Sequence, residues 1–323
     1  MGANPRLTIG LPVYNGEPFV TETLESLLGQ TYGDFELIVS DNCSTDRTEA
    51  ICRRYARRDP RIRYVRQARN IGAAPNHNFV AQQACGELFK WSSADDLCAR
   101  DFLQRCIEAL DQCPDVVLAH SWTALIDSVG AITEAVEYPS DTGALRAPDR
   151  FRTMLEGARG SDDYGGVVRL RVLRQTPLFG SHHFADRTLF TELALRGRFY
   201  HVPDWLHFRR DHAGAAYRMC PTVRQRCANF DPRRADRLRH PSVRLYAEYA
   251  WGFAASIQRV PLTAPERLEC YAHLGRFLAD RAVPSAGRVL RGGPIPRERA
   301  LVGAALPALV LDDIVAGRAG SLS

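Results

Sequence analysis

Apolar and polar positions follow two alternating patterns along the first 120 residues. Short apolar runs, each typical of a buried strand, cover residues 7–15, 35–42, 62–67, 86–96 and 115–127. Between them, apolar residues at helical spacing predict helices over residues 17–28, 48–55, 76–84 and 102–110. Strands that alternate with helices favour a mainly parallel sheet with right-handed crossovers. We therefore predict an α/β, Rossmann-like fold with helices flanking the sheet.

Polar side chains follow three of the predicted strands at the points where they end. These clusters are Pro12 to Asn15, Asp41 with Asn42, and Asp95 with Asp96. The carboxyl ends of parallel strands meet at one edge of a sheet, and ligands in such sheets bind at that edge. The pattern alone therefore predicts that the three clusters converge on one binding site.

The pattern changes in the second half of the chain. Residues 142–177 are rich in Gly, Pro and Arg, which predicts long loops over the sheet rather than core. A helix closed by Gly197 is expected next, then strand-like segments, and after about residue 240 two amphipathic helices. We therefore predict a main domain over residues 1–240, with halves at about 1–120 and 121–240, and a helical C-terminal extension over 241–323.

Composition narrows the class of protein. Hydrophobic residues make up 45% and charged residues 24%, as is ordinary for a globular chain of 323 residues. No apolar run approaches the roughly 20 residues of a spanning helix, and the first ten residues lack a signal-peptide pattern. Nine cysteines without a CxxC pair favour reduced thiols over disulfides or a zinc site. We therefore expect a cytoplasmic protein.

Charge is distributed unevenly along the sequence. Residues 1–150 carry a net charge of −6 and residues 151–323 one of +11, and 41 of the 42 basic residues are arginine. Eight arginines lie between Arg218 and Arg244, against only Asp231 and Asp236. This stretch is open to three interpretations: a solvated basic face, contact with an anionic lipid surface or a phosphorylated ligand, or nucleic-acid binding. No recognised nucleic-acid-binding module accompanies it, so we do not expect nucleic acid as a partner.

The strand-end carboxylates each have an ordinary and a functional interpretation. Asp41 is either a turn residue or a hydrogen-bond acceptor for a nucleotide base. Asp95 and Asp96 form either a solvated turn or a site for Mg²⁺ or Mn²⁺, which prefer hard oxygen ligands and bridge to a diphosphate. Such a metal needs only one or two protein carboxylates, so a short acidic motif suffices.

Taken together, these motifs resemble the family 2 glycosyltransferases, which have the GT-A fold. The segment LPVYNGEPFVTETLESLLGQTYGDFELIVSDNCSTDRTEA is similar to the opening of that family, and RNIGAAPNHNFVAQQACGELFKWSSADD is similar to its next block. FADRTLFTELALRGRFYHVPDWLHFRRDHAG resembles its acceptor-side block. The resemblance covers residues 7–120 strongly and residues 121–215 more loosely.

The resemblance implies a set of donor-binding residues. Pro12, Tyr14 and Asn15 match the loop that holds the nucleotide base, with Tyr14 as a stacking partner, and Asp41 matches the carboxylate that recognises the base edge. Two further matches, Asn70 and Gly72, lie in a turn near the diphosphate.

The metal motif is matched with one departure. Asp95 matches the last acid of the D-x-D motif, but Ser93 replaces the first acid. Ser93 and Asp95 are still expected to bind the donor, with the Ser93 hydroxyl hydrogen-bonding a ribose or a metal-bound water. A hydroxyl adds no charge, so Asp96 is expected to share the task of holding Mn²⁺ or Mg²⁺. His212 matches a position that in relatives approaches the metal or the diphosphate; its ordinary interpretation is a structural histidine.

The remaining implied residue is the catalytic base. Asp186 falls where these enzymes carry that base, and the alternative is that it caps the helix that follows it. Inversion by direct displacement needs a carboxylate that deprotonates the acceptor hydroxyl on the face opposite the leaving group.

The resemblance thus implies an inverting transferase that moves a sugar from a nucleotide-diphosphate donor to an acceptor hydroxyl. The expected donor is a UDP-, GDP- or dTDP-sugar. The expected acceptor is a saccharide, a lipid-linked molecule or a small molecule, with peripheral contact to the inner membrane surface as a further possibility. A non-catalytic sugar-nucleotide-binding relative, suggested by Ser93, and a nucleic-acid-binding protein are the alternatives.

Overall fold

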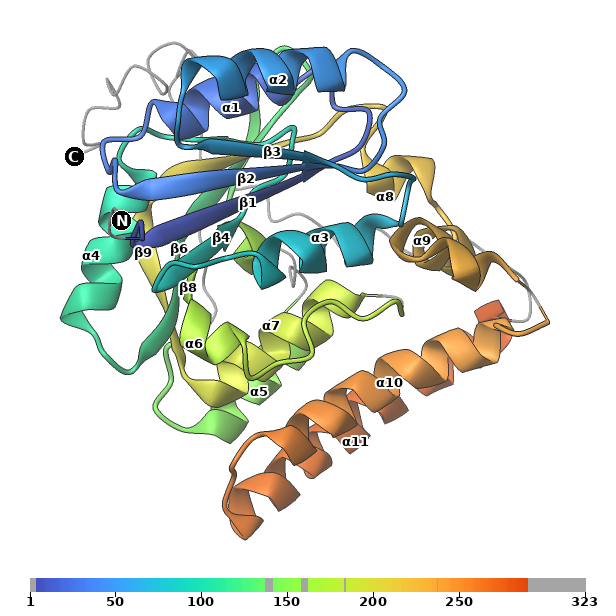
Figure 1. Cartoon of the computed structure of the whole chain (residues 1–323). Coiled ribbons are helices and arrows are strands. Elements are labelled where there is room, and N and C mark those ends of the chain that lie inside the picture. Colours follow the sequence, from blue (N-terminus) through green and yellow to red (C-terminus); the bar gives the residue numbers. More distant parts are fainter. Residues whose placement is uncertain (1–3, 137–141, 158–161, 183, 237, 290–323) are drawn as a thin grey trace.

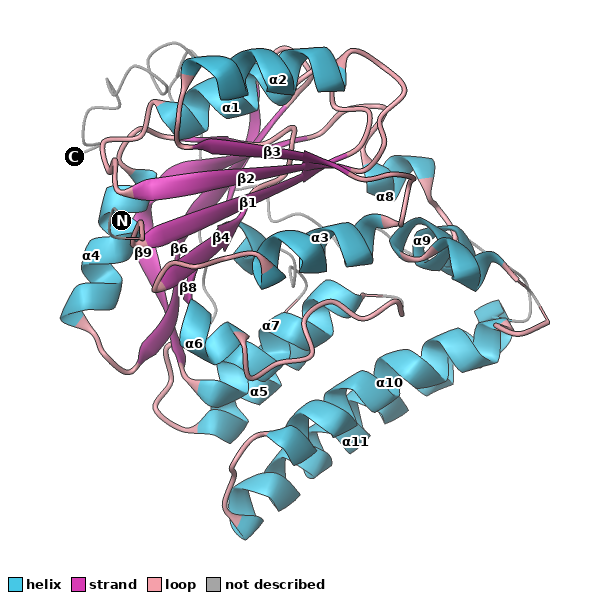
Figure 2. Cartoon of the chain, viewed as in Figure 1, coloured by secondary structure: helices cyan, strands magenta, loops and turns pink. Residues whose placement is uncertain are grey.

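A single mixed sheet organises the molecule (Figures 1 and 2). The computed structural model describes residues 4–136, 142–157, 162–182, 184–236 and 238–289. Within these ranges the sheet has nine strands in the order β3-β2-β1-β4-β8-β6-β9-β5, with β7 paired to β6. The strands are β1 (Leu7–Val13), β2 (Phe35–Asp41), β3 (Ile62–Arg66), β4 (Leu88–Trp91), β5 (Leu97–Cys98), β6 (Val116–Ile126), β7 (Ile132–Val136), β8 (Val167–Arg169) and β9 (Arg198–Arg210).

The sheet is parallel in its first half and mixed in its second. Strands β3, β2, β1 and β4 all run parallel, as the alternating pattern predicts. Strand β8 is antiparallel to both β4 and β6, whereas β9 is parallel to β6 and antiparallel to β5. The carboxyl ends of β1, β2 and β4 therefore share one edge of the sheet.

Helices cover both faces of the sheet (Figure 2). The helices are α1 (Val20–Leu28), α2 (Thr48–Arg58), α3 (Ala73–Gln82), α4 (Phe102–Gln112), α5 (Ala147–Glu156), α6 (Leu170–Leu173), α7 (Ala185–Arg196), α8 (Ala216–Met219), α9 (Val223–Phe230), α10 (Ser242–Arg259) and α11 (Ala264–Val289), with 3₁₀ turns η1 (Asp162–Gly165) and η2 (Pro232–Ala235). In the part of the chain that the structure describes, no helix is both long enough and apolar enough to cross a membrane.

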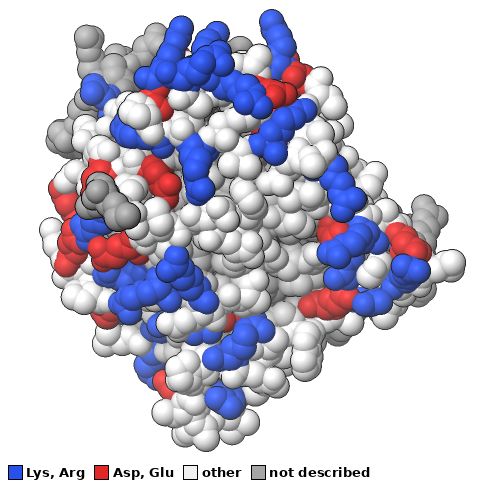
Figure 3. Space-filling model, in the orientation of Figure 1, with Lys and Arg blue, Asp and Glu red and all other residues white. Residues whose placement is uncertain are grey.

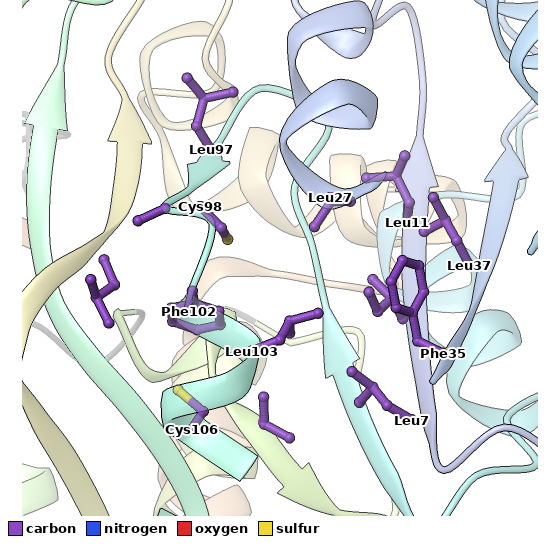
Figure 4. Close-up of a cluster of buried hydrophobic side chains, with 14 of the residues drawn as sticks. Leu7, Leu11, Leu27, Phe35, Leu37, Leu97, Cys98, Phe102, Leu103 and Cys106 are labelled. Atoms are coloured by element: carbon purple, nitrogen blue, oxygen red, sulfur yellow. The ribbon is translucent and has the colours of Figure 1, made fainter. Parts of the chain in front are cut away.

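Two apolar cores follow from the alternation of side chains along the strands. One face of β1 and β2 buries Leu7, Leu11, Phe35 and Leu37 against α1 and α4 (Figure 4). The other face places Ile38 in a second core with residues of α3 and α7. Burial on both faces explains why these strands are nearly continuous apolar runs in the sequence.

The segment 142–177 corrects one expectation. We predicted long loops over the sheet, but the described residues of this segment include α5, α6 and the central strand β8. The prediction was wrong because the proline and the arginines of this segment stand where a helix and a buried strand can accommodate them. Pro148 stands in the first turn of α5, where a proline costs no hydrogen bond. Arg150 and Arg169 are buried and donate to backbone carbonyls.

The helical C-terminal part is present as α10 and α11, which form a hairpin (Figure 1). Its buried residues Phe253 and Ile257 share a third core with Phe151 of α5 and Leu195 of α7. Glu192 of α7, almost fully buried, accepts from Ser256 and Arg259 of α10. The hairpin is thus packed onto the main domain. The remainder of the predicted extension, residues 290–323, lies outside the described residues.

We expect Phe253→Ala to lower the free energy of unfolding by about 3–5 kcal/mol, the usual cost of deleting a buried ring. Phe253 is fully buried, with its ring 5.0 Å from that of Tyr249 and 5.9 Å from that of Phe277. Trp251→Ala is the matched control, because Trp251 lies on the same helix but is 64% exposed, and it should change stability by less than about 1 kcal/mol. Urea denaturation followed by circular dichroism measures both. Equal effects of the two substitutions would contradict the shared core.

Candidate active site

The loop after β1 is tied to the loop after β2. The backbone N–H of Asn15 donates to the Ser44 hydroxyl at 2.9 Å, and the N–H of Thr45 donates to the Asn15 side-chain oxygen at 2.9 Å. Asn15 has φ of 51°, a left-handed conformation that asparagine tolerates well. Pro12 is buried in β1, whereas the Tyr14 ring is about half exposed. This loop therefore presents an aromatic face at the carboxyl edge, as expected for a stacking residue.

Asp41, at the end of β2, is fully buried. Its carboxylate accepts from the Ser44 N–H at 2.8 Å, from the Tyr64 hydroxyl at 2.8 Å and from Arg66 at 2.9 Å. These three donors fix the start of the β2–α2 loop. The predicted contact of Asp41 with a base edge remains a prediction.

Asn42, to which we assigned no role from the sequence, contacts the turn that carries Asn70 and Gly72. Its amide donates to the Asn70 side-chain oxygen at 3.0 Å and to the Gly72 carbonyl at 3.2 Å, and its oxygen accepts from the Ile71 N–H at 2.9 Å. Asn70 also accepts from the Gly72 N–H at 2.9 Å. Asn42 thus holds the predicted diphosphate turn against the end of β2. The only signal in the sequence was its position beside Asp41.

Gly72 connects this turn to the second half of the chain. It has φ of 93°, and a Cβ there would lie 2.6 Å from the Phe230 carbonyl and 2.7 Å from Pro232. Only glycine fits this conformation and this close approach. The turn that carries Asn70 and Gly72 is therefore in contact with the segment between α9 and η2.

The acidic motif follows β4 and meets the residues that follow β9. The carboxylate of Asp95 lies 3.0 Å from Nε2 of His212, and both side chains are partly exposed. The ring of Phe19 packs on this cluster: its centroid is 4.5 Å from the His212 ring and 4.7 Å from the Arg210 guanidinium. Two predicted metal-site residues are therefore in direct contact.

Arg210 is a second residue that the sequence did not assign. Its side chain is buried and donates to the Asp95 carbonyl at 3.0 Å and to Glu22 of α1 at 2.6 Å. Its backbone N–H donates to the Asp96 carboxylate at 3.0 Å. Arg210 therefore holds the acidic motif onto the end of β9.

Asp96 points into the protein rather than to the surface. It is 7% exposed, and one oxygen lies 3.8 Å from Nε2 of the buried His207. Burial and the neighbouring Asp95 raise the pKa of Asp96 to about 7. The hydroxyl of Ser93, which replaces the first acid of the D-x-D motif, forms a hydrogen bond with this carboxyl group. The predicted role of Asp96 in metal binding remains a prediction. In the part of the chain that the structure describes, no group of three or more His, Cys, Asp or Glu residues could hold a metal ion.

Asp186 lies in the first turn of α7. The residue at the N-cap is Phe184, with φ of 53°, so the alternative role of Asp186 as the N-cap does not match the structure. Burial raises the pKa of Asp186, while the backbone N–H groups at the start of the helix and nearby Arg187 and Arg226 act against that rise. No direct contact joins Asp186 to Asp95 or His212 among the described residues. Its role as base remains a prediction.

Comparison with known proteins finds a family that matches the first half of the chain. The model of glycosyl transferase family 2 matches residues 8–155. EpsJ, an uncharacterized glycosyltransferase of Bacillus subtilis, is 37% identical over 108 residues, which are 33% of this chain and 31% of EpsJ. The glycosyltransferase GlyG of Streptococcus pneumoniae is 29% identical over 206 residues, 64% of this chain and 68% of GlyG. The chain thus spans about a third of the length of EpsJ.

Comparison with solved structures identifies the fold. The crystal structure of S. aureus TarS 1-349 in complex with UDP-GlcNAc superposes with a TM-score of 0.67 at 18% identity, over 88% of this chain and 76% of that chain. The expected GT-A fold with a helical C-terminal part is confirmed. The expected relationship to the family 2 glycosyltransferases is confirmed as well.

We expect Gly72→Ala to weaken nucleotide binding by roughly tenfold and to lower stability by about 1–3 kcal/mol, because the new Cβ forces the turn away from Phe230 and Pro232. Gly33→Ala is the matched control: a Cβ there meets nothing within 4 Å. Calorimetric titration with UDP and with GDP, in the presence of Mn²⁺, measures the effect. If Gly72→Ala binds as tightly as Gly33→Ala, the turn is not part of the donor site.

Proposed function

Given that residues 8–155 form a glycosyl transferase family 2 domain, we propose that the protein is an inverting, metal-dependent glycosyltransferase. It transfers a sugar from a nucleotide-diphosphate donor to an acceptor hydroxyl. The observation that supports this best is the pairing of Asp95 with His212 at the carboxyl edge that also carries Tyr14 and the Asn70 turn. The edge offers an aromatic face for a base, a polar turn for a diphosphate and two metal-binding side chains.

The residues present fit a divalent cation. A carboxylate oxygen and an imidazole nitrogen are both ligands that such cations accept, and the Asp95 oxygen and the His212 nitrogen lie 3.0 Å apart. Mg²⁺ and Mn²⁺ accept such incomplete protein sites because donor phosphates and water complete their coordination. When bound, the cation neutralises charge on the departing diphosphate. Asp95 and His212 are the residues that would hold it, and Arg210 keeps Asp95 in place.

Asp186 acts as the base in this proposal. Its carboxylate takes the proton from the acceptor hydroxyl while that oxygen bonds to the anomeric carbon. The bond between this carbon and the diphosphate oxygen breaks on the opposite face, and the nucleoside diphosphate leaves. Attack from the face opposite the leaving group inverts the anomeric configuration. The raised pKa of Asp186 suits a group that must accept a proton near neutral pH.

The donor and the acceptor are proposed only by class. A UDP-, GDP- or dTDP-sugar suits the donor side, and a saccharide, a lipid-linked molecule or a small molecule suits the acceptor side. TarS was solved with UDP-GlcNAc, which supports the same class of donor here. Cytoplasmic location and peripheral membrane contact remain predictions.

We expect Asp95→Ala to abolish metal-dependent nucleotide binding and to leave the fold intact. Asp95 is partly exposed, and among the described residues its carboxylate hydrogen-bonds only to His212. Calorimetry with UDP or GDP, with Mn²⁺ and with EDTA, measures the change. Asp204→Asn is the control, since it removes a half-exposed carboxylate of β9 outside the site. Unchanged Mn²⁺-dependent affinity in Asp95→Ala would overturn the metal assignment.

We expect Asp186→Asn to lower turnover by roughly 10²-fold or more, since an amide cannot accept the proton. Donor binding should stay within a few-fold, which separates a lost base from a lost binding site. In the wild type, the pH profile of kcat should rise through a pKa above the ordinary value for aspartate, because the base works only when deprotonated. Activity close to wild type in Asp186→Asn would exclude the base role. Intact donor binding with no transfer by the wild type would favour the non-catalytic alternative.

A further inference from the structure

A basic cavity lies at the end of the sheet opposite the acidic motif. It has a volume of about 470 Å³ and opens where β6 and β9 begin. Its lining includes Arg150, Arg171, Arg196 and Arg198, and Asp115 is the only acidic residue among them. Basic side chains gather over α6 and the adjoining end of α7 in the space-filling view (Figure 3). Nothing in the proposed transfer reaction uses this cavity.

Two of these arginines form no ion pair and no hydrogen bond with an acidic side chain among the described residues. Arg150 is 5% exposed, and its guanidinium donates to the carbonyls of Ala144, Leu145, Ala194 and Leu195. Burial, and then the like charge of Arg198, lower the pKa of Arg150. The second, Arg171 of α6, is exposed, and its guanidinium makes no hydrogen bond or ion pair within the described part of the chain.

The acidic side chains that pair with Arg196 and Arg198 do not neutralise the charge of the cavity. Arg198 pairs with Asp115 at 2.9 Å, and Arg196 pairs with Glu192 at 2.8 Å. Glu192 is shared, because Arg259 of α10 also pairs with it at 2.6 Å. The lining itself therefore holds four guanidinium groups and one carboxylate, although the charges of Glu266 and Asp149 also act on Arg150. An anion in the cavity would offset the remaining positive charge and relieve the repulsion between Arg150 and Arg198.

We propose that this cavity binds a small soluble ligand that carries two or more phosphate groups. Its volume falls in the range of small-molecule sites, about 300–1,000 Å³. Guanidinium groups match phosphate oxygens as bidentate donors, and several arginines around one hollow favour a polyanion over a single charge. A phosphate ligand needs no metal there, because the arginines themselves supply the positive charge.

The proposed site is separate from the donor site. Arg198 and Arg210 lie at opposite ends of β9, twelve residues apart, which corresponds to roughly 40 Å of extended strand. Arg210 contacts the acidic motif, whereas Arg198 lines the cavity. A ligand in the cavity therefore touches none of the residues assigned to donor binding, and the two proposals can fail independently.

The test is calorimetric titration of the full chain with sodium tripolyphosphate in EDTA, which removes metal-dependent binding at the donor site. We expect one site per chain in the wild type, and at least tenfold weaker binding in Arg171→Ser and in Arg198→Ser. Arg171 is exposed and unpartnered, so its substitution leaves the fold intact even if loss of Arg198 does not. Arg57→Ser with Arg58→Ser is the matched control, since both are exposed on α2 and the pair removes two charges elsewhere.

Each result decides the matter. Binding that persists in the Arg57/Arg58 control and in Asp95→Ala, but weakens in Arg171→Ser, supports the site. No binding by the wild type, or unchanged binding by Arg171→Ser, overturns it. An equal loss in the control variant would indicate unspecific charge attraction, and a loss in Asp95→Ala would place the tripolyphosphate at the donor site; both overturn the proposal.

Discussion

The buried guanidinium of Arg210 is the interaction on which the site depends. It joins three segments that are distant in sequence. It contacts the acidic motif through the Asp95 carbonyl and the turn after β6 through the carbonyls of Asp127 and Ser128. It also contacts the start of α1 through Glu22 and the ring of Phe19. A planar group with five donors can satisfy this geometry, whereas a lysine ammonium cannot. The cost of burying the charge is offset only if these contacts are all made. Arg210 therefore fixes the position of Asp95, and His212, two residues further along, is placed beside it.

Contacts between segments that are distant in sequence also position the turn of residues 70–72, the proposed donor turn. Asn42 ties residues 70–72 to β2, and Gly72 brings that turn against Phe230 and Pro232. The α10–α11 hairpin then packs on α5 and α7, and α7 carries Asp186. The proposed donor residues and the proposed base are thus positioned by contacts between the first and second halves of the chain. One apolar core therefore contains residues from both sides of residue 240.

The sequence predicted those features that depend on local pattern. Strands β1, β2 and β4 are buried on both faces and therefore read as apolar runs, and their polar ends share an edge because parallel strands end together. The hydrogen bonds of Asn42, Arg210 and Asp41 could not be predicted, since each depends on which distant segment lies opposite. Segment 142–177 was misread for a related reason: a buried arginine such as Arg150 is satisfied by carbonyls that only the folded chain brings together.

The arginines that lie close together in the sequence are not the ones that gather around the cavity in the structure. The arginine-rich stretch after residue 217 suggested a basic surface, yet the structure pairs most of its described members with acids. Arg218 pairs with Asp211, Arg233 with Asp231, and Arg234 and Arg244 both with Glu248. These pairs offset part of the positive charge of the stretch, and its predicted contact with an anionic surface remains a prediction. Four other arginines line the cavity, Arg150 and Arg171 among them, and they come from segments that no run of arginines marks in the sequence. Net charge along a chain therefore indicates how much attraction for anions a protein has, but the fold decides where an anion can bind.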